Sequence, residues 1–124
     1  MKRALITHAH SDHARSGNES YLCSHPCLPL LELRLGKKAK IETIPFGQKH
    51  KIGDALVSFH PAGHILGSAQ VRVEVAGRVF VVSGDYKPDG DQTCEEFEPV
   101  KCHLFISECT FGLPVYRWKP EEYV

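Results

Sequence analysis

The chain has 124 residues, 15 basic against 15 acidic side chains, and therefore no net charge. Hydrophobic residues make up 42% of the sequence and charged residues 24%, which is typical of an ordinary globular domain. The balanced charge excludes a basic surface over the whole chain, so any patch that binds nucleic acid must be local. We expect one domain, long enough to bury a hydrophobic core.

The N-terminal segment and the cysteines indicate the compartment. Only three apolar residues follow Met1-Lys2-Arg3, which is too short a run for a signal peptide. No apolar run approaches the ~20 residues that a membrane-spanning helix needs. The five cysteines are unevenly spaced and odd in number, which favours reduced thiols over a disulfide framework. We therefore expect a cytoplasmic protein with no membrane association.

The first elements predicted along the chain are a strand and a helix. The apolar run at 4–6 predicts a short buried strand. The segment 26–35 predicts a helix, because Leu28, Leu31 and Leu35 share one face and both prolines fit the first turn. Gly36 is the expected stop of this helix.

Later apolar segments predict strands and one hairpin. The hairpin joins 70–75 to 78–83, and its second strand is apolar on both faces at 79–82, as in a strand covered on both sides. Other short strands are expected at 41–45, 55–59 and 104–106.

Polar side chains follow three of these strands at the point where each strand ends. His8, Asp85 and Glu108 each come just after an apolar run. A fold that gathers strand ends along one sheet edge would bring these side chains together. Such side chains belong on loops held by a rigid scaffold.

The first of these loops is dense in metal-ligating groups. The segment 7–13, THAHSDH, holds three imidazoles and one carboxylate, which are the ligand types that Zn²⁺ and similar ions take. In an extended or loosely turned loop, His8 and His10 point to one side and can hold one ion, while Asp12 and His13 face a second. The alternative is a solvated polar loop without a metal, which the density of ligands after a buried strand disfavours.

The string HAHSDH resembles the HxHxDH motif of the metallo-β-lactamase superfamily. Residues 63–68, GHILGS, and 83–86, SGDY, resemble the third and fourth metal motifs of that superfamily in order and spacing. The resemblance implies an α+β fold, a four-layer αββα sandwich of which this chain supplies about half. It also implies two divalent metal ions, with Zn²⁺ favoured and Mn²⁺ as the alternative.

By the same resemblance, six residues are metal ligands. They are His8, His10 and His64 on the first ion, Asp12 and His13 on the second, and Asp85 as the bridge between the two.

One branch of the superfamily fits best. The segment 106–112, ISECTFG, resembles motif A of the beta-CASP nucleases, with Glu108 as its acid. The run from 60 to 118 most resembles bacterial ligase-associated DNA exonucleases, which are relatives of RNA 3′-end processing nucleases. The resemblance implies a DNA exonuclease acting in DNA repair. The alternatives are an RNA-processing nuclease of the same branch, a small-molecule hydrolase acting on a thioester or lactone, and a non-catalytic metal-binding module.

Catalytic roles follow from this assignment. Asp12 would ligate a metal and orient the nucleophile, Asp85 would fix the distance between the metals, and Glu108 would hold a ligand in its productive orientation. Ser68 and Lys87 are expected to contact the substrate.

The resemblance covers nearly the whole chain but not the whole catalytic unit of the family. Family members carry an upstream strand with an aspartate motif and a downstream beta-CASP cap. We therefore expect 1–124 to be a metallo-β-lactamase-type core truncated at both ends, with the general acid outside it. The resemblance implies nucleic acid as the partner, DNA rather than RNA, together with a DNA ligase or helicase. Arg117, Trp118 and Lys119 are further candidates for contact with a nucleic-acid strand.

Overall fold

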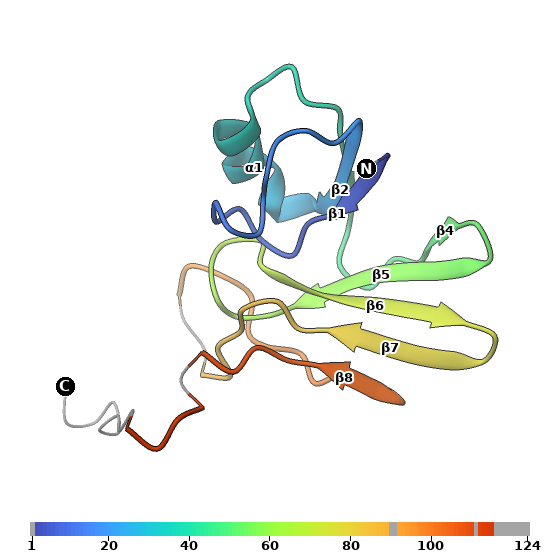
Figure 1. Ribbon diagram of the computed structural model, residues 1–124, viewed down its shortest axis with the longest axis vertical. Coiled ribbons are helices and arrows are strands. Elements are labelled where there is room, and N and C mark those ends of the chain that lie inside the picture. Colours follow the sequence, from blue (N-terminus) through green and yellow to red (C-terminus); the bar gives the residue numbers. More distant parts are fainter. Residues whose placement is uncertain (1, 90–91, 111, 116–124) are drawn as a thin grey trace.

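A computed structural model describes residues 2–89, 92–110 and 112–115. Phe111 of the predicted acidic motif, and Arg117, Trp118 and Lys119, lie outside these residues. The described chain forms two β-sheets and one α-helix. In Figure 1 the first sheet and the helix lie above, and the strands of the second sheet lie below.

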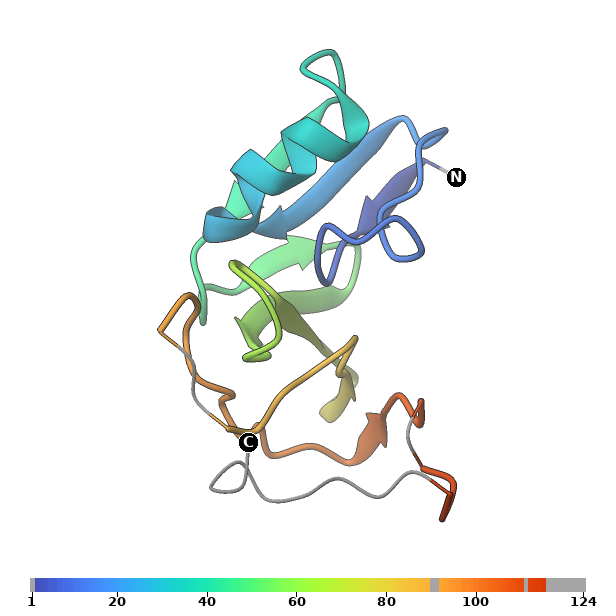
Figure 2. The same cartoon turned by 90° about the vertical axis from the view of Figure 1, so that its left-hand side faces the viewer.

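The first sheet consists of three parallel strands in the order β1-β2-β3. Their bounds are Arg3–Leu5 for β1, Ser20–Ser24 for β2 and Ile41–Ile44 for β3. The connection from β2 to β3 contains the short 3-10 helix η1 (His25–Cys27) and the α-helix α1 (Leu28–Leu35). A parallel pair needs such a crossover, and Figure 2 shows α1 lying along one face of the sheet.

Helix α1 follows the predicted pattern closely. It ends before Gly36, which adopts a left-handed φ of 86° and stops the helix as the sequence predicts. Leu31 is fully buried and Leu35 packs beside it, whereas Leu33 on the other side is 84% exposed. Cys23 and Cys27 lie in the same buried cluster as Leu31, where they act as small apolar side chains.

The second sheet has five strands in the order β4-β5-β6-β7-β8. All neighbours are antiparallel except β7 and β8, which are parallel. The bounds are His50–Ile52 for β4, Ala55–Pro61 for β5, Ala69–Val75 for β6, Arg78–Val82 for β7 and Leu104–Ile106 for β8. The three-residue strand β4 was not predicted, because its sequence HKI carries no alternating pattern.

The two sheets pack face to face through β2, β3, β5 and β6. Leu22 and Ile44 of the first sheet share a buried cluster with Val57, Phe59 and Val71 of the second. The described residues therefore supply three of the four predicted layers, in the order helix, sheet, sheet (Figure 1). No second helical layer occurs in this part of the chain.

The expectation that residues 79–82 are covered on both faces is wrong at Val82. Val81 is buried, but Val82 is 37% exposed. Val82 shares a face with its cross-strand partner Val71, the face that points toward the first sheet. Both views place β7 and β8 farther from the first sheet than β5 (Figures 1 and 2).

Two further observations bear on the expectations from composition. All five cysteines are free thiols. Among the described residues, no helix has the length and apolar character needed to span a bilayer.

Candidate metal centre

Four of the six predicted ligands meet in one compact group. His8, His10, His64 and Asp85 each direct one ligand atom to it, and these atoms all lie within 4.8 Å of one another. His10 Nδ1 lies 3.1 Å from His8 Nε2 and 3.4 Å from His64 Nε2. Three imidazole nitrogens and one carboxylate oxygen form a donor set that divalent ions such as Zn²⁺ accept. We therefore describe this group as a candidate metal site.

The carboxylate of Asp85 faces two sets of donors. Its Oδ2 lies 3.6 Å from His8 Nε2 and 3.7 Å from His64 Nε2. Its Oδ1 lies 3.2 Å from Nε2 of His13, a side chain outside the compact group. Asp12 Oδ2 in turn lies 3.6 Å from His13 Nε2. Asp12 and His13 therefore flank the site on the Oδ1 side of Asp85.

Three loops bring these side chains together. The first follows β1 and contains a turn in which the Ala14 amide donates to the His10 carbonyl (2.8 Å). The second, between β5 and β6, carries His64, and the third follows β7 and carries Asp85. The Lys87 amide donates to the Ala62 carbonyl (3.0 Å), which joins the second loop to the third.

Thr7 contacts two histidines of the site on the side away from Asp85. We did not infer this role from the sequence. Thr7 Oγ1 lies 3.2 Å from His8 Nδ1 and 3.4 Å from His13 Nδ1. The Thr7 hydroxyl therefore holds the Nδ1 atom of both imidazoles. The Nε2 atoms of His8 and His13 face the carboxylate of Asp85. Hydrogen bonds to the far nitrogen fix the tautomer and the orientation of metal-ligating histidines.

Electrostatics favour neutral imidazole at the centre of the site. Burial, followed by the charges of His13, His64 and His10, lowers the pKa of His8 to about 3. A neutral imidazole keeps the lone pair that a metal ion requires. A hydrogen bond from its own backbone amide lowers the pKa of Asp12, which is 69% exposed and is ionised at neutral pH.

Glu108, Ser68 and Lys87 lie in the loops that support the group. Glu108 Oε1 accepts a hydrogen bond (3.2 Å) from the backbone amide of Tyr86, the residue after Asp85. Glu108 Oε2 accepts a hydrogen bond (2.7 Å) from the Thr110 hydroxyl. Ser68 is buried, and its hydroxyl oxygen accepts hydrogen bonds from the backbone amides of His64 (2.9 Å) and Ile65 (3.2 Å). These contacts order the loops that carry Asp85 and His64. The predicted contacts of Ser68 and Lys87 with substrate stay predictions.

Two proteins of known name are similar to this chain over almost its whole length. The chain is 38% identical, over 97% of its residues, to the Opitutus terrae protein "Probable DNA ligase". It is 31% identical, over 96% of its residues, to the Neurospora crassa protein "Endoribonuclease ysh-1". The chain spans only 12% and 15% of the length of these relatives. No family model matches the sequence.

Solved structures give an independent comparison of shape. The chain is similar to a metallo-β-lactamase motif mutant from Cronobacter sakazakii with a TM-score of 0.58 and 16% identity. The match covers 74% of this chain and 44% of the other. At this level of identity, the match establishes the fold alone.

Proposed function

Because the chain has the metallo-β-lactamase fold and beta-CASP nucleases among its homologues, we propose that it is the catalytic core of a metal-dependent phosphodiester hydrolase. The observation that carries this proposal is the position of Asp85. One of its oxygens faces His8 and His64, and the other faces His13. A two-metal hydrolase needs two ions about 3.5–4 Å apart, and a carboxylate with a donor set on each side can hold two ions close together.

We propose that the two donor sets hold two divalent ions, Zn²⁺ in preference to Mn²⁺. Such ions, when bound, lower the pKa of a coordinated water and offset negative charge on a phosphate. His8, His10 and His64 would hold the first ion, His13 and Asp12 would hold the second, and Asp85 would set the distance between them.

The remaining carboxylates have distinct proposed roles. Asp12 is ionised, exposed and adjacent to His13, so its carboxylate can accept a hydrogen bond from the attacking water and orient it. Glu108 is a positioning residue, because it binds the Tyr86 amide and fixes the backbone beside Asp85. Ser68 supports His64, and Lys87 stays our proposed contact for the substrate phosphate.

We further propose that the substrate is DNA and that the reaction is exonucleolytic cleavage during DNA repair. The relative at 38% identity carries the name of a DNA ligase, which supports DNA as the substrate and a DNA ligase as the partner. The relative at 31% identity is named an endoribonuclease, which supports RNA as the alternative substrate.

A cleavage assay on the full-length protein tests this proposal. End-labelled single-stranded DNA and RNA of matched sequence would be incubated with Zn²⁺, with Mn²⁺ and with chelator. We expect metal-dependent shortening of DNA, no cleavage in chelator, and no cleavage by Asp85→Ala. Preference for RNA would move the function to RNA processing. If the metal-loaded protein cleaves neither the DNA nor the RNA, the proposal that it is a nuclease is contradicted.

A further inference from the structure

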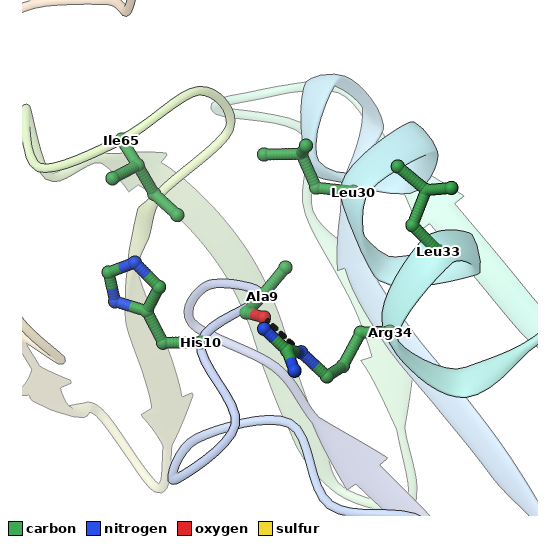
Figure 3. A pocket seen from close by; sticks show the side chains of 6 residues that line it. All are labelled: Ala9, His10, Leu30, Leu33, Arg34 and Ile65. Carbon is green, nitrogen blue, oxygen red and sulfur yellow. Dashed lines mark hydrogen bonds between the residues drawn. The ribbon is translucent and has the colours of Figure 1, made fainter.

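A hollow of about 500 Å³ opens beside the candidate metal site. Helix α1 forms one wall with Leu30, Leu33 and Arg34, and Ile65 of the loop between β5 and β6 lies opposite. Ala9 and His10 form the remaining side (Figure 3). The volume lies in the range of about 300–1,000 Å³ that is typical of small-molecule sites.

The hollow and the metal site share a side chain. His10 lines the hollow, and its Nδ1 lies 3.1 Å from His8 Nε2 in the compact ligand group. Ala9, between these two histidines, also lines the hollow. A molecule held at the metal site by its phosphate can therefore reach this hollow past the His10 side chain.

The lining is apolar with one cationic group. Leu33 is 84% exposed on α1, so it contributes little to the core and gives the hollow a bare apolar rim. Arg34 donates from Nε to the Ala9 carbonyl (3.1 Å), which fixes the guanidinium at the base of the hollow (Figure 3). Its Nη1 and Nη2 atoms form no hydrogen bond with the described residues, which leaves donors for a ligand anion. Aliphatic side chains can pack against the apolar face of a base, and a fixed guanidinium can donate hydrogen bonds to a phosphate.

We propose that this hollow holds the base of the nucleotide next to the scissile phosphate, with Arg34 contacting the neighbouring backbone phosphate. The proposal rests on the phosphodiesterase function proposed above and adds to it a subsite for one unpaired nucleotide. The aliphatic walls offer few hydrogen-bonding groups to a base edge, so the subsite accepts any base and requires a single strand.

Methyl NMR on the zinc-loaded, full-length protein tests this subsite. Thymidine 5′-monophosphate and 2-deoxyribose 5-phosphate would be titrated in parallel. We expect ring-current shifts at the methyl groups of Leu30, Leu33 and Ile65 with the nucleotide and none with the sugar phosphate. Leu33→Gln should weaken nucleotide binding by about fivefold through lost apolar contact, and Leu104→Gln, an exposed leucine of β8, should not.

Hydrolysis of bis(p-nitrophenyl) phosphate by the same sample separates the subsite from the proposed function. Hydrolysis without methyl shifts, or equal shifts with the sugar phosphate, would overturn the nucleotide subsite and leave the phosphodiesterase standing. Methyl shifts at the three residues without hydrolysis would support the subsite and contradict the phosphodiesterase.

Discussion

Gly84 lies so close to Thr7 that a Cβ atom on Gly84 would stand 2.7 Å from the Cβ atom of Thr7. Gly84 also has a left-handed φ of 59° and directly precedes Asp85. Both the close approach and the backbone angle require glycine. This contact therefore sets the position of Asp85 relative to the threonine that holds His8 and His13.

Gly84→Ala is expected to lower the free energy of unfolding by about 2–4 kcal/mol and to weaken zinc binding, because Thr7 must move away. Urea denaturation and competition with a chromophoric chelator measure the two effects. Gly77→Ala is the matched control, since Gly77 has a φ of 73° but open space around it. The control should lose about 1–2 kcal/mol of stability and no zinc affinity. Equal zinc affinity in both variants would contradict this account of Gly84.

The hydroxyl of Thr7 is expected to raise metal affinity. Thr7→Val keeps the shape of the side chain and removes the oxygen that contacts His8 and His13, so zinc affinity should fall about 10- to 100-fold. Thr43→Val is the control, because Thr43 Oγ1 lies 3.1 Å from Nδ1 of His25 outside the metal site. Isothermal calorimetry with Zn²⁺ measures both variants. An equal loss of zinc affinity in the two variants would contradict the role of the Thr7 hydroxyl in holding the metal ligands.

Two leucines of α1 are expected to differ sharply in their contribution to stability. Leu31 is fully buried, so Leu31→Ala should cost about 2–5 kcal/mol through the lost side chain and the cavity that it leaves. Leu33 is 84% exposed, so Leu33→Ala should change stability by about 0.5 kcal/mol or less. Urea denaturation of both variants gives the comparison. A large loss at Leu33 would mean that this side chain is covered in the protein, which conflicts with its place on the open hollow.

One substitution in the turn between β6 and β7 is expected to raise the stability of the protein. Ala76 has a φ of 49° and Gly77 a φ of 73°, so both central residues of the turn are left-handed. Ala76→Gly should relieve the strain and raise stability by about 0.5–1 kcal/mol. Ala55→Gly, in a strand, should lower stability by about the same amount. A thermal unfolding midpoint that falls for Ala76→Gly would contradict the assigned turn.

The apolar runs predicted that His8 and Asp85 lie together, and the resemblance to the metallo-β-lactamase motifs added His10 and His64. His8 and Asp85 follow apolar runs, and the structure ends β1 and β7 shortly before them. The spacing of the helical leucines likewise predicted α1, and Gly36 predicted where it ends. These features are local, because periodicity and glycine placement reflect the geometry of one element.

The contacts between elements could not be predicted in this way. The Arg34 bond to the Ala9 carbonyl joins residues 25 positions apart and depends on how α1 packs against the first loop. Thr7 carried a weak signal, since it precedes His8, but its contact with His13 depends on the turn after His10. The exposure of Val82 depends on where the first sheet lies, which the apolar pattern of β7 does not contain.

The most direct test of the central claim is a zinc titration of metal-free, full-length protein with hydrolysis of a single-stranded oligonucleotide as the readout. We predict that activity rises until two equivalents of Zn²⁺ are bound and is absent in Asp85→Asn, which keeps the shape of the side chain and removes its charge. Asp54→Asn, in an exposed turn, should titrate like the unaltered protein. Full activity in chelator, or unchanged activity in Asp85→Asn, would contradict a two-metal centre built on Asp85.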